Sequence, residues 1–253
     1  MIVFWDIDDT IYDRCDAFSS ACDRFLNTPA MKKRAASAGD EAHFPLPDGR
    51  IIYRFCDKRG DEVFKASQTG EISMAEMYVY RYCKGFADAG ILISPEEALL
   101  FQNIYEEQQK QISCTETMRS ALRLSSERAE KTGILTNGPS GKQRGKIASL
   151  GIAPFLTEDL VLISGELGTD KPEKEIFLLA QERSGVPAKE LLLIGDSLKN
   201  DIIPASAMGW NTVWFNRHHA SAAGTGTIAD ETVDTEEELL QALSRILQPA
   251  VTV

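Results

Sequence analysis

Residues 2–10 read Ile2-Val3-Phe4-Trp5-Asp6-Ile7-Asp8-Asp9-Thr10, an apolar run that ends abruptly in three acids and a threonine. An apolar run this short is typical of a buried strand rather than of a helix. In open parallel α/β sheets, ligands bind at the carboxyl ends of the strands. We therefore expect these acidic residues to lie where a functional site would form.

The spacing of Asp6 and Asp8 predicts a shared site. Residues two apart in an extended chain point the same way, so both carboxylates can face one point as the strand ends. Carboxylates this close raise each other's pKa, and a cation that prefers oxygen ligands, such as Mg²⁺, relieves the repulsion. One acid could then act as nucleophile and the other as general acid and base. Taken alone, the stretch is equally consistent with an acidic surface turn.

The composition is that of a soluble globular protein with an excess of acidic groups. The 253 residues are 43% hydrophobic and 26% charged, with a formal net charge of −11 and a pI of about 4.9. This length suits one large domain, or a core domain with a second lobe. The negative charge argues against nucleic-acid polymers and anionic membranes as partners. A small anionic substrate remains compatible, because a metal ion and one lysine reverse the local sign of charge.

The cysteines and the apolar runs bear on the cellular compartment. The five cysteines are odd in number and show no C-x-x-C spacing, which predicts free thiols in a reducing compartment. No apolar run approaches the length of a transmembrane helix. The N-terminal run lacks the basic region of a signal peptide, so we expect a cytoplasmic protein.

Residues 14–117 are predicted to be mostly helical. Residues 94–97, Ser-Pro-Glu-Glu, combine a cap residue, a proline at the first helical position and a glutamate at the third. Residues 39–50 contain prolines and glycines and are predicted to form a loop. Because no strand alternation is found here, we expect a helical domain inserted into a core formed by residues 1–13 and 118–253.

From residue 118 onward, helical and strand patterns alternate, which predicts βαβ units and a parallel sheet. Four more buried strands are expected, each followed by a loop. They cover residues 133–135, 160–163, 191–194 and 211–215. A final helix is expected over about residues 235–247, and its acidic start suits a helix N-terminus.

Polar residues follow these strands at the expected sheet edge. Thr136 offers a hydroxyl, and the backbone of Asn137 and Gly138 offers N–H groups, which suit phosphate oxygens. Thr-Asn-Gly is by itself also a common turn. Lys171 precedes Pro172 and is predicted to stand just before a helix N-terminus, where an anion is attracted. The alternative for Lys171 is an exposed loop position.

Two further carboxylates, Asp196 and Asp201, follow Gly195 after the next strand. The glycine permits a tight turn at the end of that strand. Acids gathered at one sheet edge need a cation or a lysine to balance them. As isolated residues, they would instead cap the next helix.

Together these motifs resemble the haloacid dehalogenase-like hydrolase superfamily. Their order is acid-x-acid-x-threonine, then threonine, then lysine, then glycine-aspartate with a second aspartate, each after a predicted strand. The resemblance covers residues 1–13 and 118–216, and the inserted helices resemble that superfamily's helical cap of the first type. It implies an α/β fold, with a Rossmann-like parallel sheet in a three-layer α/β/α core and an inserted all-helical cap domain.

The resemblance implies a role for each motif residue. Asp6 looks like the nucleophile that forms an aspartyl-phosphate, and Asp8 like the general acid that protonates the leaving group and then activates water. Thr136 and Lys171 would bind the transferring phosphoryl group, while Thr10 would brace the first loop. Mg²⁺ would be held by Asp6, the Asp8 carbonyl and Asp196, with Asp201 orienting a metal-bound water or the lysine. Dehalogenating members lack a carboxylate at the position of Asp8, so its presence favours phosphate ester hydrolysis.

A narrower resemblance is to the branch that contains pyrimidine 5′-nucleotidases. It rests on residues 70–73 with Arg81, and on residues 213–219. Sugar-phosphate phosphatases share parts of this pattern, and residues 70–73 equally suit a simple helix cap. The chain departs from the branch in the loop at 43–50, and in lacking a Pro-Gly near residues 114–116.

Arg14 and Phe18 come just after the first motif and would lie beneath a cap. Both are candidates for contacting the leaving group of the substrate, since cap closure assembles such sites. A surface arginine and a core phenylalanine are the structural alternatives.

We therefore expect a Mg²⁺-dependent phosphatase of small phosphorylated metabolites, acting as a monomer or weak dimer. Nucleoside 5′-monophosphates are the first expected substrate class and sugar phosphates the second. A phosphomutase or phosphonate hydrolase on the same fold, and a non-catalytic phosphate-binding protein, are the alternatives. A receiver-type signalling module uses similar residues but would be about half as long and lack the helical insertion.

Overall fold

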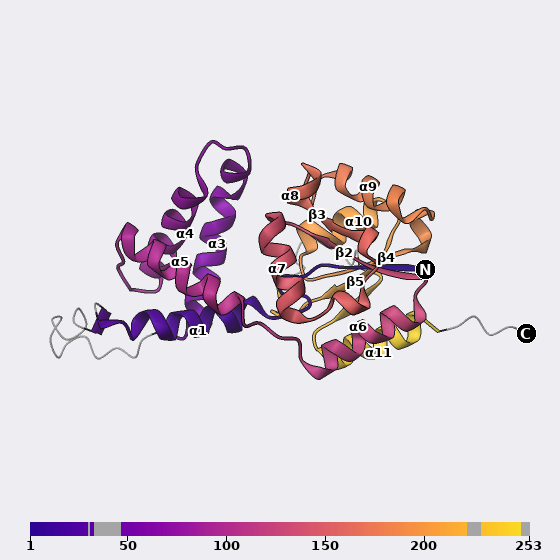
Figure 1. The fold of residues 1–253 in the computed structure, drawn as a ribbon, viewed down its shortest axis with the longest axis horizontal. Helices are drawn as coiled ribbons and strands as arrows, with labels where there is room; N and C mark the ends of the chain where they lie inside the picture. Colours follow the sequence, from indigo (N-terminus) through magenta and orange to yellow (C-terminus); the bar gives the residue numbers. More distant parts are fainter. Residues whose placement is uncertain (30, 33–46, 222–228, 249–253) are drawn as a thin grey trace, which may run out of the picture. The chain divides into compact units, whose positions relative to one another are not determined.

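The computed structural model describes residues 1–29, 31–32, 47–221 and 229–248, which form two compact units (Figure 1). The first unit comprises Met1–Asp13 and Ile112–Val253, and we call it the core unit. The second comprises Arg14–Gln111, and we call it the helical unit. Most of the loop expected at 39–50 lies outside the described residues.

The core unit is built on one six-stranded parallel sheet with the strand order β3-β2-β1-β4-β5-β6. Its strands are β1 (Ile2–Trp5), β2 (Lys131–Thr136), β3 (Val161–Ile163), β4 (Leu191–Gly195), β5 (Asn211–Phe215) and β6 (Glu231–Val233). Trp5 at the end of β1 pairs with Ile134 of β2 on one side and with Ile194 of β4 on the other. The acidic residues that follow Trp5 therefore emerge in the middle of the sheet's carboxyl edge.

Helices cover both faces of this sheet, as expected for a three-layer α/β/α core. The helices are α6 (Glu116–Arg128), α7 (Ser140–Leu150), α8 (Ser164–Leu167), α9 (Lys174–Ser184), α10 (Ile203–Ala207) and α11 (Glu236–Ile246). Figure 1 shows α9 and α10 on one side of the sheet and α6 with α11 on the other. Even-numbered residues of β1, Ile2 and Phe4, pack in one apolar cluster with Ile176 and Phe177 of α9. The β1 run is apolar throughout because both of its faces are buried.

The helical unit contains α1 (Arg14–Leu26), α3 (Gly49–Gln68), α4 (Met74–Asp88) and α5 (Pro95–Gln109). Ser73 and Ser94 each form a capping box, with Glu76 and Glu97 respectively, so these helix starts follow directly from the sequence. The interior is aromatic, with edge-to-face pairs that join α1, α3, α4 and α5. Its fully or nearly fully buried rings are Phe18, Phe25, Tyr53, Tyr82, Phe86, Phe101 and Tyr105.

Two details differ from the sequence prediction. The second boundary between the units falls between Gln111 and Ile112, earlier than the expected Thr117–Met118. The reason is that α6 belongs to the core, where Thr115 and Thr117 donate hydrogen bonds to Glu236 and Glu237 at the start of α11. The sequence analysis also missed β6, an edge strand with a single buried residue. No helix in the described part of the chain has the length and apolarity needed to cross a membrane.

Helices α3 and α4 approach closely at Gly85, and this contact generates a stability prediction. A Cβ on Gly85 would lie 2.4 Å from Cys56 Sγ and 2.7 Å from Cys56 Cα, so the substitution Gly85→Ala forces the helices apart. We expect it to lower the free energy of unfolding by about 1–3 kcal/mol, the usual cost of overpacking.

Urea unfolding followed by circular dichroism measures this loss. Gly145→Ala on α7 is the matched control, because a Cβ there meets no atom within 4 Å. Helix propensity alone should make that control neutral or more stable. Equal stability of the Gly85→Ala variant and the wild type would contradict the close packing of α3 on α4.

Candidate functional site

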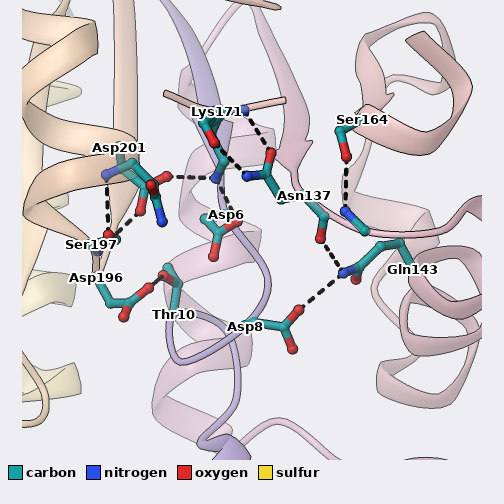
Figure 2. A network of polar contacts seen from close by, with 12 residues as sticks. Asp6, Asp8, Thr10, Asn137, Gln143, Ser164, Lys171, Asp196, Ser197 and Asp201 are labelled. Carbon is teal, nitrogen blue, oxygen red and sulfur yellow. Dashed lines mark hydrogen bonds and ion pairs between the residues drawn. The ribbon is translucent and has the colours of Figure 1, made fainter. Parts of the chain in front are cut away.

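The candidate site lies at the carboxyl ends of β1, β2 and β4 (Figure 2). Asp6 directly follows β1, and its N–H donates to the carbonyl of Ile194, so the pairing with β4 continues one residue past the strand. Thr136 is the last residue of β2 and Gly195 the last of β4. The parallel register thus brings together residues that are far apart in the sequence.

Lys171 is the central cation of the site. Its side chain is 3% exposed, and its Nζ lies 2.7 Å from Asp6 Oδ1 and 2.5 Å from Asp201 Oδ1. The Asn137 side chain holds the backbone of Lys171 in place through two hydrogen bonds. Asn137 Nδ2 donates to the Lys171 carbonyl at 2.7 Å, and the Lys171 N–H donates to Asn137 Oδ1 at 2.8 Å. Asn137 therefore acts on the site through its side chain.

Two sequence expectations about this region need correction. Helix α9 begins at Lys174, so Pro172 is not its first residue and Lys171 does not stand directly at a helix N-terminus. Ion pairs and Asn137 hold Lys171 instead. The Gly138 N–H, expected to face a phosphate, donates to Ser164 Oγ at 2.9 Å. That N–H therefore serves the packing of the β2 loop against α8.

Three acidic side chains form a cluster beside Lys171. Oxygen atoms of Asp6, Asp196 and Asp201 all lie within 4.8 Å of one another. The Ser197 N–H donates to Asp201 Oδ2 at 3.0 Å and holds this carboxylate in place. Gly195 leaves room for it, because a Cβ there would lie 2.5 Å from the same oxygen. Thr10 is fully buried and its hydroxyl donates to Asp196 Oδ1 at 3.5 Å, which places it beside the acidic cluster.

The electrostatics of the cluster favour a cation. The pKa of Asp6 is raised to about 6. Burial is the largest cause, Lys171 opposes it, and the charges of Asp201 and Asp8 add to the increase. The pKa of Lys171 is raised although burial alone would lower it, because Asp201 and Asp6 outweigh the desolvation. Three carboxylates face one ammonium here, so net negative charge remains. Oxygen donors at this spacing fit Mg²⁺, a hard cation.

Thr136 completes the site with an unused hydroxyl. Its side chain is 1% exposed, and its Oγ1 has no hydrogen-bond partner among the described residues. Buried hydroxyls are nearly always hydrogen-bonded, so at this edge of the sheet the Thr136 hydroxyl can bond to a water or to a ligand oxygen. The oxygens of an incoming phosphoryl group would supply that partner.

Asp8 faces a different set of groups. Its carboxylate receives hydrogen bonds from Tyr12, Gln143 and Lys146, and it is not part of the acidic cluster. The sequence analysis missed Gln143 and Lys146. One signal was present, because both share the α7 face of the buried residues Ile147 and Leu150. Two polar residues on an inward face need partners inside the fold.

The comparison with protein-family models decides the family. Residues 1–209 match the model of the haloacid dehalogenase-like hydrolases, which is most of the chain. The chain belongs to this family. The resemblance stated from the motifs is thereby confirmed.

Known proteins similar to this haloacid dehalogenase-like hydrolase include several phosphatases. The pyrimidine 5′-nucleotidase YjjG of Escherichia coli is 36% identical over 116 residues, which cover 46% of this chain and 50% of that protein. A glyceraldehyde 3-phosphate phosphatase of Methanocaldococcus jannaschii is 33% identical over 116 residues, with the same coverage. The chain thus spans about half the length of these curated relatives.

Solved structures share the fold of this haloacid dehalogenase-like hydrolase along nearly the whole chain. The magnesium-bound putative HAD-hydrolase YfnB of Bacillus subtilis aligns with a TM-score of 0.70 at 21% identity, covering 98% of each chain. The L-2-haloacid dehalogenase of Xanthobacter autotrophicus aligns with a TM-score of 0.64 at 14% identity, covering 96% of this chain and 97% of the other. These similarities establish the fold.

The two residues expected to contact a substrate lie in the helical unit of this family member. Phe18 is fully buried and packs edge-to-face against Tyr53, Phe101 and Tyr105. It is a core residue of the helical unit, which was the structural alternative for this position. Arg14 is partly exposed and pairs with Asp57 at 3.3 Å.

The loop after β5 supports the first motif of the family. His218 Nε2 lies 3.5 Å from Asp9 Oδ1 and 3.7 Å from Asp13 Oδ1, and Arg217 donates to the Thr10 carbonyl at 3.2 Å. The hydrogen bond to Asp9 raises the pKa of His218, aided by the charges of Asp9 and Asp13, while burial and Arg217 oppose the shift. When it is protonated, His218 forms ion pairs that join this loop to the residues following Asp8.

The raised pKa of His218 predicts a pH-dependent stability difference. A group whose pKa is higher in the folded state stabilises fully below its unfolded pKa, about 6.5 for histidine, and loses that effect as the pH rises through the folded value. The difference in unfolding free energy between wild type and His218→Ala should therefore be larger at pH 5.5 than at pH 9. Urea unfolding at both pH values measures it.

The neighbouring variant His219→Ala is the control, since that side chain is three-quarters exposed. Its effect on stability should change less between the two pH values. A His218→Ala effect that stays constant, or grows with pH, would contradict the ion pair with Asp9.

Proposed function

We propose that the protein is a Mg²⁺-dependent phosphatase that hydrolyses small phosphate monoesters through an aspartyl-phosphate on Asp6. The observation that carries this proposal is the buried carboxylate of Asp6, which contacts Lys171 and lies among the oxygens of Asp196 and Asp201. Phosphoryl transfer depends on positioning and on neutralising the charge of the transferring group. Membership of the haloacid dehalogenase-like hydrolases, and relatives named as phosphatases, support it.

In this proposal each residue acts on one part of the phosphate ester. Asp6 supplies the nucleophilic oxygen, and the Lys171 ammonium neutralises the charge of the phosphoryl oxygens. The Thr136 hydroxyl, which has no partner among the described residues, donates to one of those oxygens. Asp6, Asp196 and the Asp8 carbonyl would hold Mg²⁺, with Asp201 fixing Lys171. The metal would supply charge neutralisation at the phosphate.

Asp8 handles the proton in both half-reactions. In the first, the ester oxygen leaves phosphorus and takes the proton from the Asp8 carboxyl group. In the second, the Asp8 carboxylate takes a proton from the water that attacks the aspartyl-phosphate, which releases phosphate and restores both aspartates. General acid and base groups of this kind typically contribute 10²–10⁴-fold to a rate.

For the substrate, we propose nucleoside 5′-monophosphates first and sugar phosphates second. The pyrimidine 5′-nucleotidase and the glyceraldehyde 3-phosphate phosphatase match this chain almost equally well, which supports both classes. We further propose that the helical unit acts as the cap that holds the leaving group. Arg14 and Arg81, both paired with Asp57, are its cationic candidates. The net charge of −11 favours a small metabolite over a nucleic-acid polymer.

A panel of phosphometabolites tests the proposal. We expect phosphate release that depends on Mg²⁺, and Asp6→Asn should reduce the turnover number by about 10³-fold or more, because the nucleophile is lost. Asp159→Asn is the matched control, since Asp159 is exposed and precedes β3, at the opposite end of the strand from the site. Acid-quenched wild-type protein should carry a phosphoryl group on Asp6, detected by mass spectrometry of the peptides.

Several outcomes of the panel are informative. Wild-type turnover by Asp6→Asn would refute the mechanism. Release confined to sugar phosphates would keep the mechanism and exclude nucleotides as the main class. A phosphoryl group returned to a second position of a sugar phosphate, instead of free phosphate, would identify a mutase.

A further inference from the structure

Asp8 accepts hydrogen bonds from three side chains, those of Tyr12, Gln143 and Lys146, and Figure 2 shows the one from Gln143. Lys146 Nζ lies 2.7 Å from its Oδ1 and 2.6 Å from its Oδ2. The Tyr12 hydroxyl donates to Oδ1 at 2.7 Å, and Gln143 Nε2 donates to Oδ2 at 3.0 Å. Carboxylate oxygens accept hydrogen bonds, so these three side chains hold both oxygens of Asp8 in place.

The orientation of the Gln143 amide is fixed by a second acceptor. Its Nε2 also donates to the Asn137 carbonyl at 2.7 Å, and that carbonyl can only accept. The amide nitrogen must therefore point at Asp8 and Asn137 together, and a flipped amide would place an oxygen against two acceptors. Gly138 leaves room for this arrangement, because a Cβ there would lie 2.7 Å from Gln143 Nε2. The Asn137 carbonyl in the loop after β2 thus orients the Gln143 amide so that its nitrogen donates to Asp8.

Lys146 is placed for Asp8. This lysine is 8% exposed, and its Nζ forms an ion pair with Asp8. A buried ammonium is stable only when it is paired, and here both oxygens of one carboxylate pair with it. The nucleophile Asp6 has its own lysine, Lys171, so the site contains two separate lysine–aspartate pairs.

We propose that Gln143 and Lys146, with Tyr12, form a clamp that positions Asp8 and stabilises its carboxylate as it gives up its proton. The proposal rests on the proposed phosphatase function. When the bond between phosphorus and the ester oxygen breaks, the Asp8 proton passes to that oxygen, and negative charge develops on Asp8 opposite Lys146. The clamp residues act through Asp8 and touch no reacting atom, so they are positioning residues.

If the clamp acts through Asp8, the effect of losing it on the phosphorylation rate should depend on the leaving group of the substrate. An alkoxide leaving group, such as the ribose oxygen of a nucleoside monophosphate, needs the proton from Asp8. A 4-nitrophenolate group is stable as an anion and needs it far less. A purely structural loss at α7 would slow phosphoryl transfer from both substrates alike.

The experiment compares single-turnover phosphorylation of the enzyme by a nucleoside monophosphate, or the best alkyl phosphate of the panel, with that by 4-nitrophenyl phosphate. For Lys146→Met, we expect the alkyl phosphate rate to fall by about 10²-fold, and at least ten times more than the aryl phosphate rate. Lys142→Met is the matched control, because Lys142 is a partly exposed lysine on the same helix. It should leave the ratio of the two rates unchanged.

A second, milder variant tests the clamp independently in case Lys146→Met does not fold. Tyr12→Phe removes one donor to Asp8 and keeps the ring, and it should shift the ratio in the same direction by a smaller factor. An unchanged ratio in both variants, with wild-type activity present, would overturn the clamp alone. Absence of wild-type phosphorylation by every substrate, or full activity of Asp6→Asn, would instead overturn the proposed function beneath it.

Discussion

The compensation of buried negative charge is the constraint on which the site depends. Lys171 joins Asp6 and Asp201 across the carboxyl edge of the sheet, and all three side chains are almost fully buried. Ionised groups removed from water are tolerated only with partners at hydrogen-bond distance. Removing Lys171 would leave adjacent carboxylates without a balancing charge, which is why the geometry of the whole acidic cluster follows from this one ammonium.

The parallel sheet makes this compensation possible. Because β1 lies between β2 and β4, Asp6 emerges between Thr136 and Gly195, each supplied by a neighbouring strand. Strands β1 and β4 have no polar side chains and are buried throughout, so their polar groups occur only where the chain leaves the sheet. At the ends of the strands, side chains of the site approach the backbone closely, which requires glycine at the point of contact. Gly195 admits Asp201, and Gly138 admits Gln143.

Local patterns in the sequence were sufficient to predict β1 to β5, the capped starts of α4 and α5, and the residues at the strand ends. Each depends on a short run of apolar residues or on a cap within four positions. Strand β6 gave no such signal, because only Val233 of its three residues is buried. It lies at the sheet edge and is identified by its pairing with β5.

The site details that sequence reasoning missed are contacts between distant segments. Lys171 is held by Asp6, 165 positions earlier, and by Asp201, 30 positions later. The local sequence predicted only a position just before a helix, because these partners lie far away along the chain. The same is true of Lys146 and Asp8, which are 138 positions apart. A helical pattern indicates that position 146 faces inward, but only the fold shows which group it meets there.

The two lysine–aspartate pairs differ in a way that suits the two roles proposed for the aspartates. Lys171 contacts one oxygen of Asp6 and shares its charge with Asp201, so the second oxygen of Asp6 stays available for attack on phosphorus. Lys146, by contrast, contacts both oxygens of Asp8. A nucleophile needs an accessible oxygen, whereas a proton donor needs a stable carboxylate once the proton has left. The fold thus pairs two nearby carboxylates in different ways, and that difference suits the two roles proposed for them.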